Sequence, residues 1–206
     1  MNTKKMQVLY IEQTGHILAA VTRTAAAESL FDVKALAGTD LLVRNAEFKL
    51  GTPPSPPPSG EIFSVPMDLL KAEIVDLNEN AFVMPSNFMV GGGQANDLRG
   101  APQLSPPSNS LTSTSITIDS GSTVSEETKV WAQVQEKTPL PDSEPIRRIV
   151  AGIITPAVPS GSDGHTVTLK LRVRPDEQPT PIPTSSSKQY SILVLIAGRP
   201  PGFFTA

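Results

Sequence analysis

The alternation of apolar and polar residues is clearest in the segment HTVTLKLRVR, which runs from His165 to Arg174. Successive side chains of a strand point to opposite faces, so this alternation predicts a strand with one buried face and one exposed face. The apolar face consists of Val167, Leu169, Leu171 and Val173. The polar face consists of Thr166, Thr168, Lys170 and Arg172.

The segment MQVLYIEQTGHILAAVTRT, which begins at Met6, is apolar at most positions on either side of Thr14-Gly15. Glycine readily adopts the positive φ that a tight hairpin turn requires. The segment therefore predicts two antiparallel strands that meet at Gly15 and are buried on both faces.

Residues 24–38, TAAAESLFDVKALAG, are the best candidate for a helix. Thr24 is a suitable N-cap, the alanine run favours a helix, and Gly38 lies where a left-handed C-cap belongs. Alternation through Phe31, Val33 and Ala35 is compatible with a strand instead. We favour a short helix and keep the strand as the alternative.

Further apolar segments predict strands in both halves of the chain. The first half contains TDLLVRNAEF, EIFSV and KAEIVDLN, with a single helical turn that begins at Pro66 in PMDLL. The second half contains SITI, TKVWAQVQEK, PIRRIVAGIITPAV and KQYSILVLIAG. For residues 125–137 a helix that begins at Ser125 competes with the strand, in which Val130, Ala132 and Val134 share one face.

Proline-rich segments indicate the domain organisation, because 21 of the 206 residues are proline and proline has no N–H to donate. The segment GTPPSPPPSG (51–60) follows only about fifty residues, too few for a secure independent core. We therefore predict that it is a loop projecting from an N-terminal β-rich domain, residues 1–90. Residues 91–115, rich in Gly, Pro and Ser, predict a linker or an extended arm. A C-terminal β-rich domain with an extended tail, residues 116–206, follows.

Together these patterns predict a mainly β protein. We expect one or two antiparallel β-sandwich or barrel-like domains with long Pro-rich loops and at most one or two short helices. Whether the two halves form one domain or two stays open.

Composition argues against several functional classes. The net charge of −3 provides no basic surface for nucleic acid, and the chain has no cysteine for disulfides or thiolate metal sites. No apolar run reaches the ~20 residues that span a bilayer, and the N-terminal apolar run is too short for a signal peptide. We expect cytoplasmic synthesis without a signal peptide, no membrane insertion and no nucleic-acid partner; release from the cell as part of a particle is left open.

Residues that could support catalysis or metal binding are few. His16 and His165 each follow a glycine in a predicted turn, and we expect both to be ordinary surface residues. The segment DLNEN (76–80) begins like a calcium-binding loop, but Ala81 and Asn87 depart from the calcium-loop pattern at its sixth and twelfth positions. No phosphate-binding loop and no nucleophile elbow is present. We predict no catalytic residue, no cofactor, no metal site and no enzymatic activity.

Aromatic residues suggest where partners could bind. Trp131, the single tryptophan, is a candidate ligand-stacking platform, although we expect it to pack in the core. The tail RPPGFFTA places two prolines before Phe203 and Phe204, and we expect these prolines to end strand pairing and direct the tail outward. The alternative is that the two aromatics fold back on their own domain. The candidate interface consists of Phe203, Phe204, Ile192, Val194 and Ile196.

The leading interpretation is a non-enzymatic structural or assembly subunit of a large protein complex, for example a phage-tail-like or injection-type particle. Such a subunit would bind other protein subunits through strand edges and Pro-rich arms. One alternative is a carbohydrate- or peptide-binding β-sandwich module. A second alternative is a hydrolytic enzyme whose site carries no recognisable motif.

Overall fold

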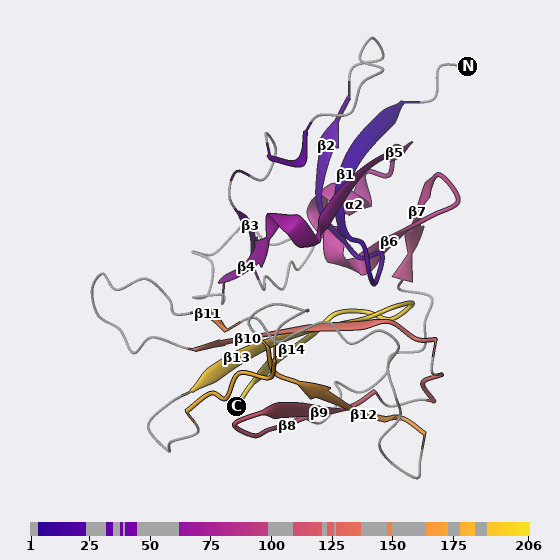
Figure 1. Ribbon diagram of the computed structural model, residues 1–206. Coiled ribbons are helices and arrows are strands. Elements are labelled where there is room, and N and C mark those ends of the chain that lie inside the picture. The colour runs from indigo at the N-terminus through magenta and orange to yellow at the C-terminus, as the bar shows by residue number, and fades with distance from the viewer. Residues whose placement is uncertain are drawn as a thin grey trace, which may run out of the picture. The chain divides into compact units, whose positions relative to one another are not determined.

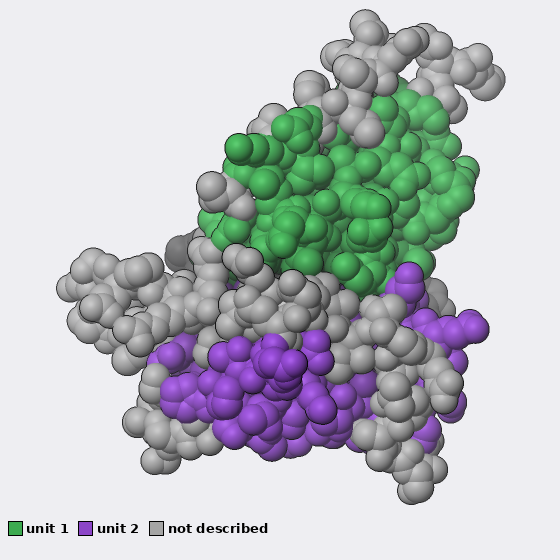
Figure 2. Space-filling model, viewed as in Figure 1, with its two compact units in different colours: residues 1–100 green, residues 101–206 purple. Residues whose placement is uncertain are grey.

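The chain is mainly β and divides into two compact units, residues 1–100 and residues 101–206 (Figure 2). The computed structural model describes residues 4–23, 32–34, 38, 40–44, 62–98, 109–120, 123–125, 127–136, 148–149, 164–172, 178–183 and 189–206. The proline run 51–60 and most of the segments 24–38 and 145–158 lie outside these residues. The mainly β prediction is confirmed.

Unit 1 is built around a three-stranded antiparallel sheet with the order β2-β1-β5. Two hairpins, β3-β4 and β6-β7, accompany this sheet. The strands are β1 (Lys5–Ile11), β2 (Ile17–Thr22), β3 (Asp40–Arg44), β4 (Ile62–Pro66), β5 (Leu70–Asp76), β6 (Phe88–Gly91) and β7 (Gln94–Asp97). The helical elements are α2 (Asn80–Val83), η1 (Met67–Leu69) and η2 (Pro85–Asn87).

The predicted hairpin is present as β1 and β2, which pair antiparallel (Figure 1). Gly15 has a φ of 76°, and its N–H donates to the carbonyl of Ile11 at 2.8 Å, so this position uses the left-handed freedom of glycine. β1 is buried on both faces as expected, but β2 is exposed at Val21 and Thr22. The prediction of complete burial is therefore wrong for the end of β2.

The core of unit 1 lies between one face of the sheet and the segment that follows β5. Met6 and Val8 of β1 and Val75 of β5 pack in one cluster with Ala81 of α2 and Phe88 of β6. The even-numbered residues of β1 share this face because strand side chains alternate. α2 and β6 therefore cover one face of the three-stranded sheet.

The predicted helix 24–38 is described only at its end. Val33 and Lys34 are helical, and the N–H of Gly38 donates to the carbonyl of Lys34 at 2.9 Å. Gly38 has a φ of 69°, as a left-handed C-cap requires. The predicted single turn after Pro66 is also confirmed, as η1.

Unit 2 contains two antiparallel sheets, with the orders β11-β10-β13-β14 and β12-β9-β8. The strands are β8 (Asn109–Leu111), β9 (Ser115–Asp119), β10 (Val130–Glu136), β11 (Arg148–Ile149), β12 (Thr166–Lys170), β13 (Tyr190–Ile196) and β14 (Gly202–Thr205). Figure 1 shows the two sheets as separate layers. Side chains from both contribute to one core, among them Ile116, Val134, Leu169 and Ile192.

The pairing of β10 decides between strand and helix for residues 125–137. Val130 to Glu136 pair continuously with β13, from Val130 opposite Ile196 to Glu136 opposite Tyr190. Val130 lies on the core face together with Ala132 and Val134, as the strand alternative predicted. The alternation of β12 is confirmed as well, because Val167 and Leu169 are buried while Thr168 and Lys170 are exposed.

Strands occupy both ends of the predicted linker 91–115. β6 and β7 form a hairpin through Gly92 and Gly93, whose φ angles of 58° and 77° fit a tight two-residue turn. β8 lies near the other end of this segment and pairs with β9. The division between the two units falls within the same segment, between Gly100 and Ala101.

No sheet closes into a barrel in the part of the chain that the structure describes, because each sheet ends in two different strands. The barrel-like alternative is therefore not observed. Within the same residues, no helix is long and apolar enough to cross a membrane.

The C-terminal tail differs from its prediction. The tail does not leave the sheet after Pro200 and Pro201; β14 returns antiparallel along β13, with Phe204 opposite Ile192. Tyr190 and Ala206 exchange backbone hydrogen bonds of 2.8 and 2.9 Å at the end of this pair. The prolines lie in the connection between the strands, where a missing N–H costs no ladder hydrogen bond.

Candidate functional site

Among the described residues of unit 1, no strand pairs with the outer edge of β5. β5 is the last strand of its sheet, and Leu77 N–H donates to Lys4 O at 3.0 Å while Glu12 N–H donates to Leu69 O at 3.4 Å. Hydrogen-bonded pairs alternate along an antiparallel ladder, so the odd-numbered residues of β5 direct their backbone groups toward β1. The even-numbered residues therefore direct their N–H and C=O groups away from the sheet.

Local bonds limit this edge at both ends. The N–H of Leu70 donates to the carbonyl of Met67, which closes η1. The N–H of Asp76 donates to the carbonyl of Gly93 at 3.3 Å, so the β6-β7 turn abuts the end of β5. Between these ends, the backbone groups of Ala72 and Ile74 face outward. We name residues 70–74 the β5 edge.

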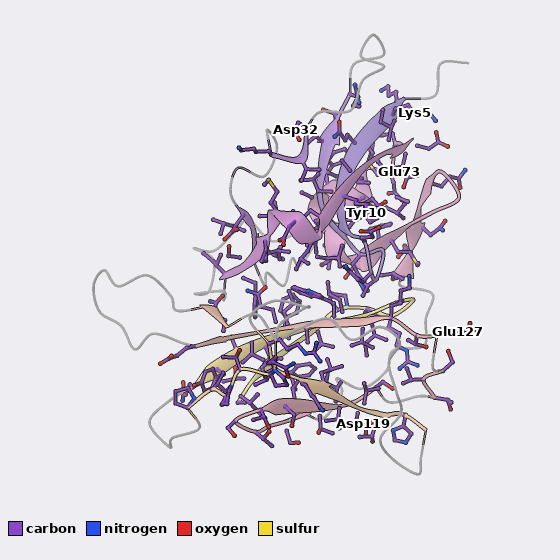
Figure 3. The ribbon with its side chains drawn as sticks, viewed as in Figure 1. Lys5, Tyr10, Asp32, Glu73, Asp119 and Glu127 are labelled. Carbon is purple, nitrogen blue, oxygen red and sulfur yellow. The ribbon has the colours of Figure 1, made fainter. Side chains whose placement is uncertain are left out.

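Charged side chains accompany the β5 edge on the face that packs against α2 and β6. Lys71 forms an ion pair with Glu12, and both side chains are about half exposed. Hydrogen bonding to Glu12 raises the pKa of Lys71 above its ordinary value. Glu73 lies two residues further along β5, so the edge presents one positive and one negative charge on the same face. Figure 3 shows Glu73 near Tyr10 of the neighbouring strand β1.

Further groups around the β5 edge have shifted pKa values. A hydrogen bond from Lys5 lowers the pKa of Asp76, and the positive charge of Lys5 acts in the same direction. Burial raises the pKa of the Tyr10 hydroxyl, and the negative charge of Glu73 adds to this effect. These pairings fix the charge pattern along β5 near neutral pH.

A second cluster of polar residues joins three loops at one end of unit 2. The ring nitrogen Nδ1 of His165 lies 2.7 Å from a carboxylate oxygen of Asp119. The hydroxyl and the N–H of Ser120 both bond to the carbonyl of His165, at 2.8 and 2.9 Å. The guanidinium of Arg199 donates to the carbonyls of Ser120 and Thr123 at 2.6 and 2.9 Å.

This loop cluster has the residue types of a hydrolytic triad without the required contact. In such a triad the serine hydroxyl bonds to the imidazole ring, which removes its proton. Here the Ser120 hydroxyl donates to the backbone carbonyl of His165, and Ser120 is itself buried. Arg199 has its pKa lowered by burial and binds two loop carbonyls. These contacts join Asp119, Ser120 and Thr123 to His165 and Arg199.

The expectation for His16 was wrong. His16 is completely buried, and its Nδ1 lies 3.0 Å from the hydroxyl of Thr14. The bridge between His16 and Met89 explains the burial, because β6 lies beside the β1-β2 turn. His165 agrees better with the surface prediction, since one third of its side chain is exposed.

The structure separates the predicted interface residues into two groups. Ile192, Val194 and Ile196 lie in the core of unit 2 and are buried. Phe204 packs against the same core and is partly buried. Phe203 is also partly buried, and alternation along β14 turns it toward the opposite face. The five residues therefore do not form one continuous exposed surface.

Other residues considered from sequence are placed as follows. Trp131 is completely buried in β10, as expected for core packing. Asp76, the first residue of the calcium-like segment, pairs with Lys5. Among the described residues, no group of three or more His, Cys, Asp or Glu side chains is placed to hold a metal ion.

No protein-family model matches the chain, and no curated protein or solved structure matches it either.

Only part of the β5 edge could be inferred from the sequence. The segment KAEIVDLN was predicted as a strand, and Lys71 and Glu73 are two of its residues. Charged residues are typical of edge strands, which they protect from unwanted pairing. The position of β5 at the end of the sheet depends on its pairing with β1, more than fifty residues away in the chain.

Proposed function

We propose that the protein is a non-enzymatic structural subunit that joins other protein chains in an assembly through open strand edges. The observation that carries this proposal is the β5 edge, where the outward N–H and C=O groups of Ala72 and Ile74 belong to the last strand of the sheet. A strand from another chain is a natural ligand for such an edge, because backbone hydrogen bonds provide the affinity.

The arrangement of the ionisable side chains supports the same proposal. Asp76 is engaged by Lys5, Glu12 by Lys71, and Asp119 by His165. These pairs connect neighbouring strands or loops, so each has a structural role in holding the fold together. The loop cluster of unit 2 supports this reading, because Arg199 and Ser120 bind backbone carbonyls.

We further propose that unit 2 is an antiparallel β-sandwich. This proposal is supported by the single core that both sheets share, with Ile118 and Val167 from one sheet and Val130 and Val194 from the other. A two-layer core of this kind gives a rigid body. A rigid body of this kind suits a subunit that holds other subunits at fixed positions in an assembly.

Sedimentation of the endogenous protein tests the proposed function. We expect the chain in a gently prepared extract of its native cells to sediment in a high-mass fraction, well above its own 21.9 kDa. Treatment of the extract with nuclease should leave this fraction unchanged. A chain found only at the mass of a free monomer would overturn the proposal.

A further inference from the structure

We propose that two copies of the chain pair through their β5 edges, antiparallel and in one defined register with Ala72 opposite Ala72 of the second copy. The two three-stranded sheets would then form one continuous sheet with the order β2-β1-β5-β5-β1-β2. This inference rests on the proposed function and adds the partner, the surface and the register.

The direction of the backbone groups restricts the register. In an antiparallel pair, residues that direct their N–H and C=O toward each other must lie opposite one another. Only the even-numbered residues of β5 direct these groups outward, so even-numbered residues of the two copies must lie opposite one another, which a twofold axis through any residue of the β5 edge allows. An axis through Lys71 or Glu73 would place two like charges directly opposite each other, which destabilises a sheet, so Ala72 and Ile74 are the two candidates to compare.

The charges of the β5 edge favour the register centred on Ala72. This register places Lys71 of each copy directly opposite Glu73 of the other copy. The two residues form a non-hydrogen-bonded pair, in which opposing side chains are closest, and opposite charges there stabilise a sheet. Twofold symmetry supplies this contact twice, so one strand of five residues is complementary to itself.

The register centred on Ile74 is disfavoured for two reasons. It places Glu73 opposite Val75 and Lys71 opposite Leu77, so neither charge meets its opposite. It also places Ala72 of the second copy opposite Asp76, where the carbonyl of Gly93 already accepts the outward N–H. In the Ala72 register, Asp76 lies beyond the paired residues, which end at Ile74.

The backbone hydrogen bonds of the pair follow from the same register. Ala72 of each copy donates to and accepts from Ala72 of the other, and the N–H of Ile74 donates to the carbonyl of Leu70 in the second copy. The N–H of Leu70 stays bonded to Met67 within its own chain. The pairing is therefore short, and the two charge pairs decide its stability and specificity.

Charge reversal with mixing tests the register directly. Lys71→Glu gives a chain with two acidic residues at the edge, and Glu73→Lys gives a chain with two basic residues. Each variant alone places like charges opposite each other, and we expect its dimer to dissociate about ten- to thirtyfold more readily than the wild type. An equimolar mixture of the two variants restores both opposite-charge contacts, so we expect a heterodimer in sedimentation equilibrium and native mass spectrometry.

Matched controls distinguish the effect of the charge contacts at the β5 edge from the effect of the change in net charge. Lys129→Glu and Glu127→Lys make the same changes in charge at exposed positions of unit 2. Glu12→Gln removes the ion pair within the chain and leaves both residues of the predicted contact in place. We expect all three controls to dimerise like the wild type. Circular dichroism of every variant verifies that the fold is kept.

Crosslinking tests the position of the twofold axis. The natural chain has no cysteine, so Ala72→Cys introduces a single thiol. We expect a short bismaleimide reagent to join two Ala72→Cys chains efficiently. Ala19→Cys is the matched control, because Ala19 and Ala72 lie on opposite sides of Leu9 in the same sheet and both are half-buried. Chains with Ala19→Cys should crosslink poorly.

The outcomes separate this inference from the proposed function. A purified wild-type chain that stays monomeric up to millimolar concentration would overturn the β5 pairing, while the high-mass fraction in cell extracts would still support assembly through another surface. A dimer that both charge reversals leave unchanged would also overturn the pairing. Loss of dimer in each reversal, followed by recovery in the mixture, would support it.

Discussion

Truncation of Phe204 is the perturbation that most directly tests the return of the C-terminal strand. Phe204 lies opposite Ile192 in the β13-β14 pair and packs against the core of unit 2. At a fully buried position, a Phe→Ala substitution lowers the free energy of unfolding by about 3–5 kcal/mol. Phe204 keeps part of its surface exposed, so we expect Phe204→Ala to lower the free energy of unfolding by about 2–3 kcal/mol.

This loss in the free energy of unfolding corresponds to a large decrease in the melting temperature. A loss of 1 kcal/mol lowers the melting temperature of a domain of this size by about 4–8 °C, so the unfolding of unit 2 should move down by about 10–20 °C. Phe204→Leu keeps an apolar contact with the core and should cost less than about 1.5 kcal/mol. Deletion of residues 202–206 should cost more than Phe204→Ala, because it also removes the Tyr190–Ala206 hydrogen bonds.

Trp131 provides the assay. It is the single tryptophan of the chain and is completely buried in β10, which pairs with β13. Its fluorescence should shift to longer wavelength when unit 2 unfolds, so urea titrations followed at Trp131 report on the unit that contains Phe204. A change of less than about 0.5 kcal/mol for Phe204→Ala, the size of an ordinary surface substitution, would refute the packing of this residue on the core.

Three further predictions address the turns, the loops and the pH dependence. Gly15→Ala should destabilise unit 1 by about 1–2 kcal/mol in urea titrations, because alanine is strained at a φ of 76°. Arg199→Met should speed hydrogen exchange at the N–H of Val124, since the loop loses two hydrogen bonds to the guanidinium; unchanged exchange would contradict this role. The raised pKa of Tyr10 predicts that stability falls as the pH rises from the ordinary tyrosine pKa through the raised one, because the unfolded chain releases its proton first. Tyr10→Phe should reduce this alkaline loss, and equal slopes for both proteins in urea titrations above pH 9 would contradict it.

The sequence determined the local elements of this protein because their causes are local. The alternation of β12 follows from the two faces of a strand, and the hairpin turn at Gly15 follows from the freedom of glycine at positive φ. The same holds for Gly38 as a C-cap and for the turn after Pro66. Each of these predictions needed only residues that are neighbours in the chain.

Strand pairing and open edges depend on contacts between residues that are distant in the chain. The alternation of apolar and polar residues indicates which face of a strand is buried, but it does not indicate which strand pairs with it. Neither the β1-β5 pair nor the β9-β12 pair could therefore be derived from the pattern. The tail was predicted to leave the sheet because prolines end pairing locally. Burial of Phe204 on the core of unit 2 opposes that local tendency, and β14 begins just after the prolines. His16 is buried for the same reason, since β6 reaches the turn from a distant part of the chain. The β5 edge depends likewise on contacts distant in sequence, because a strand lies at an edge only when no other strand of the fold pairs with it.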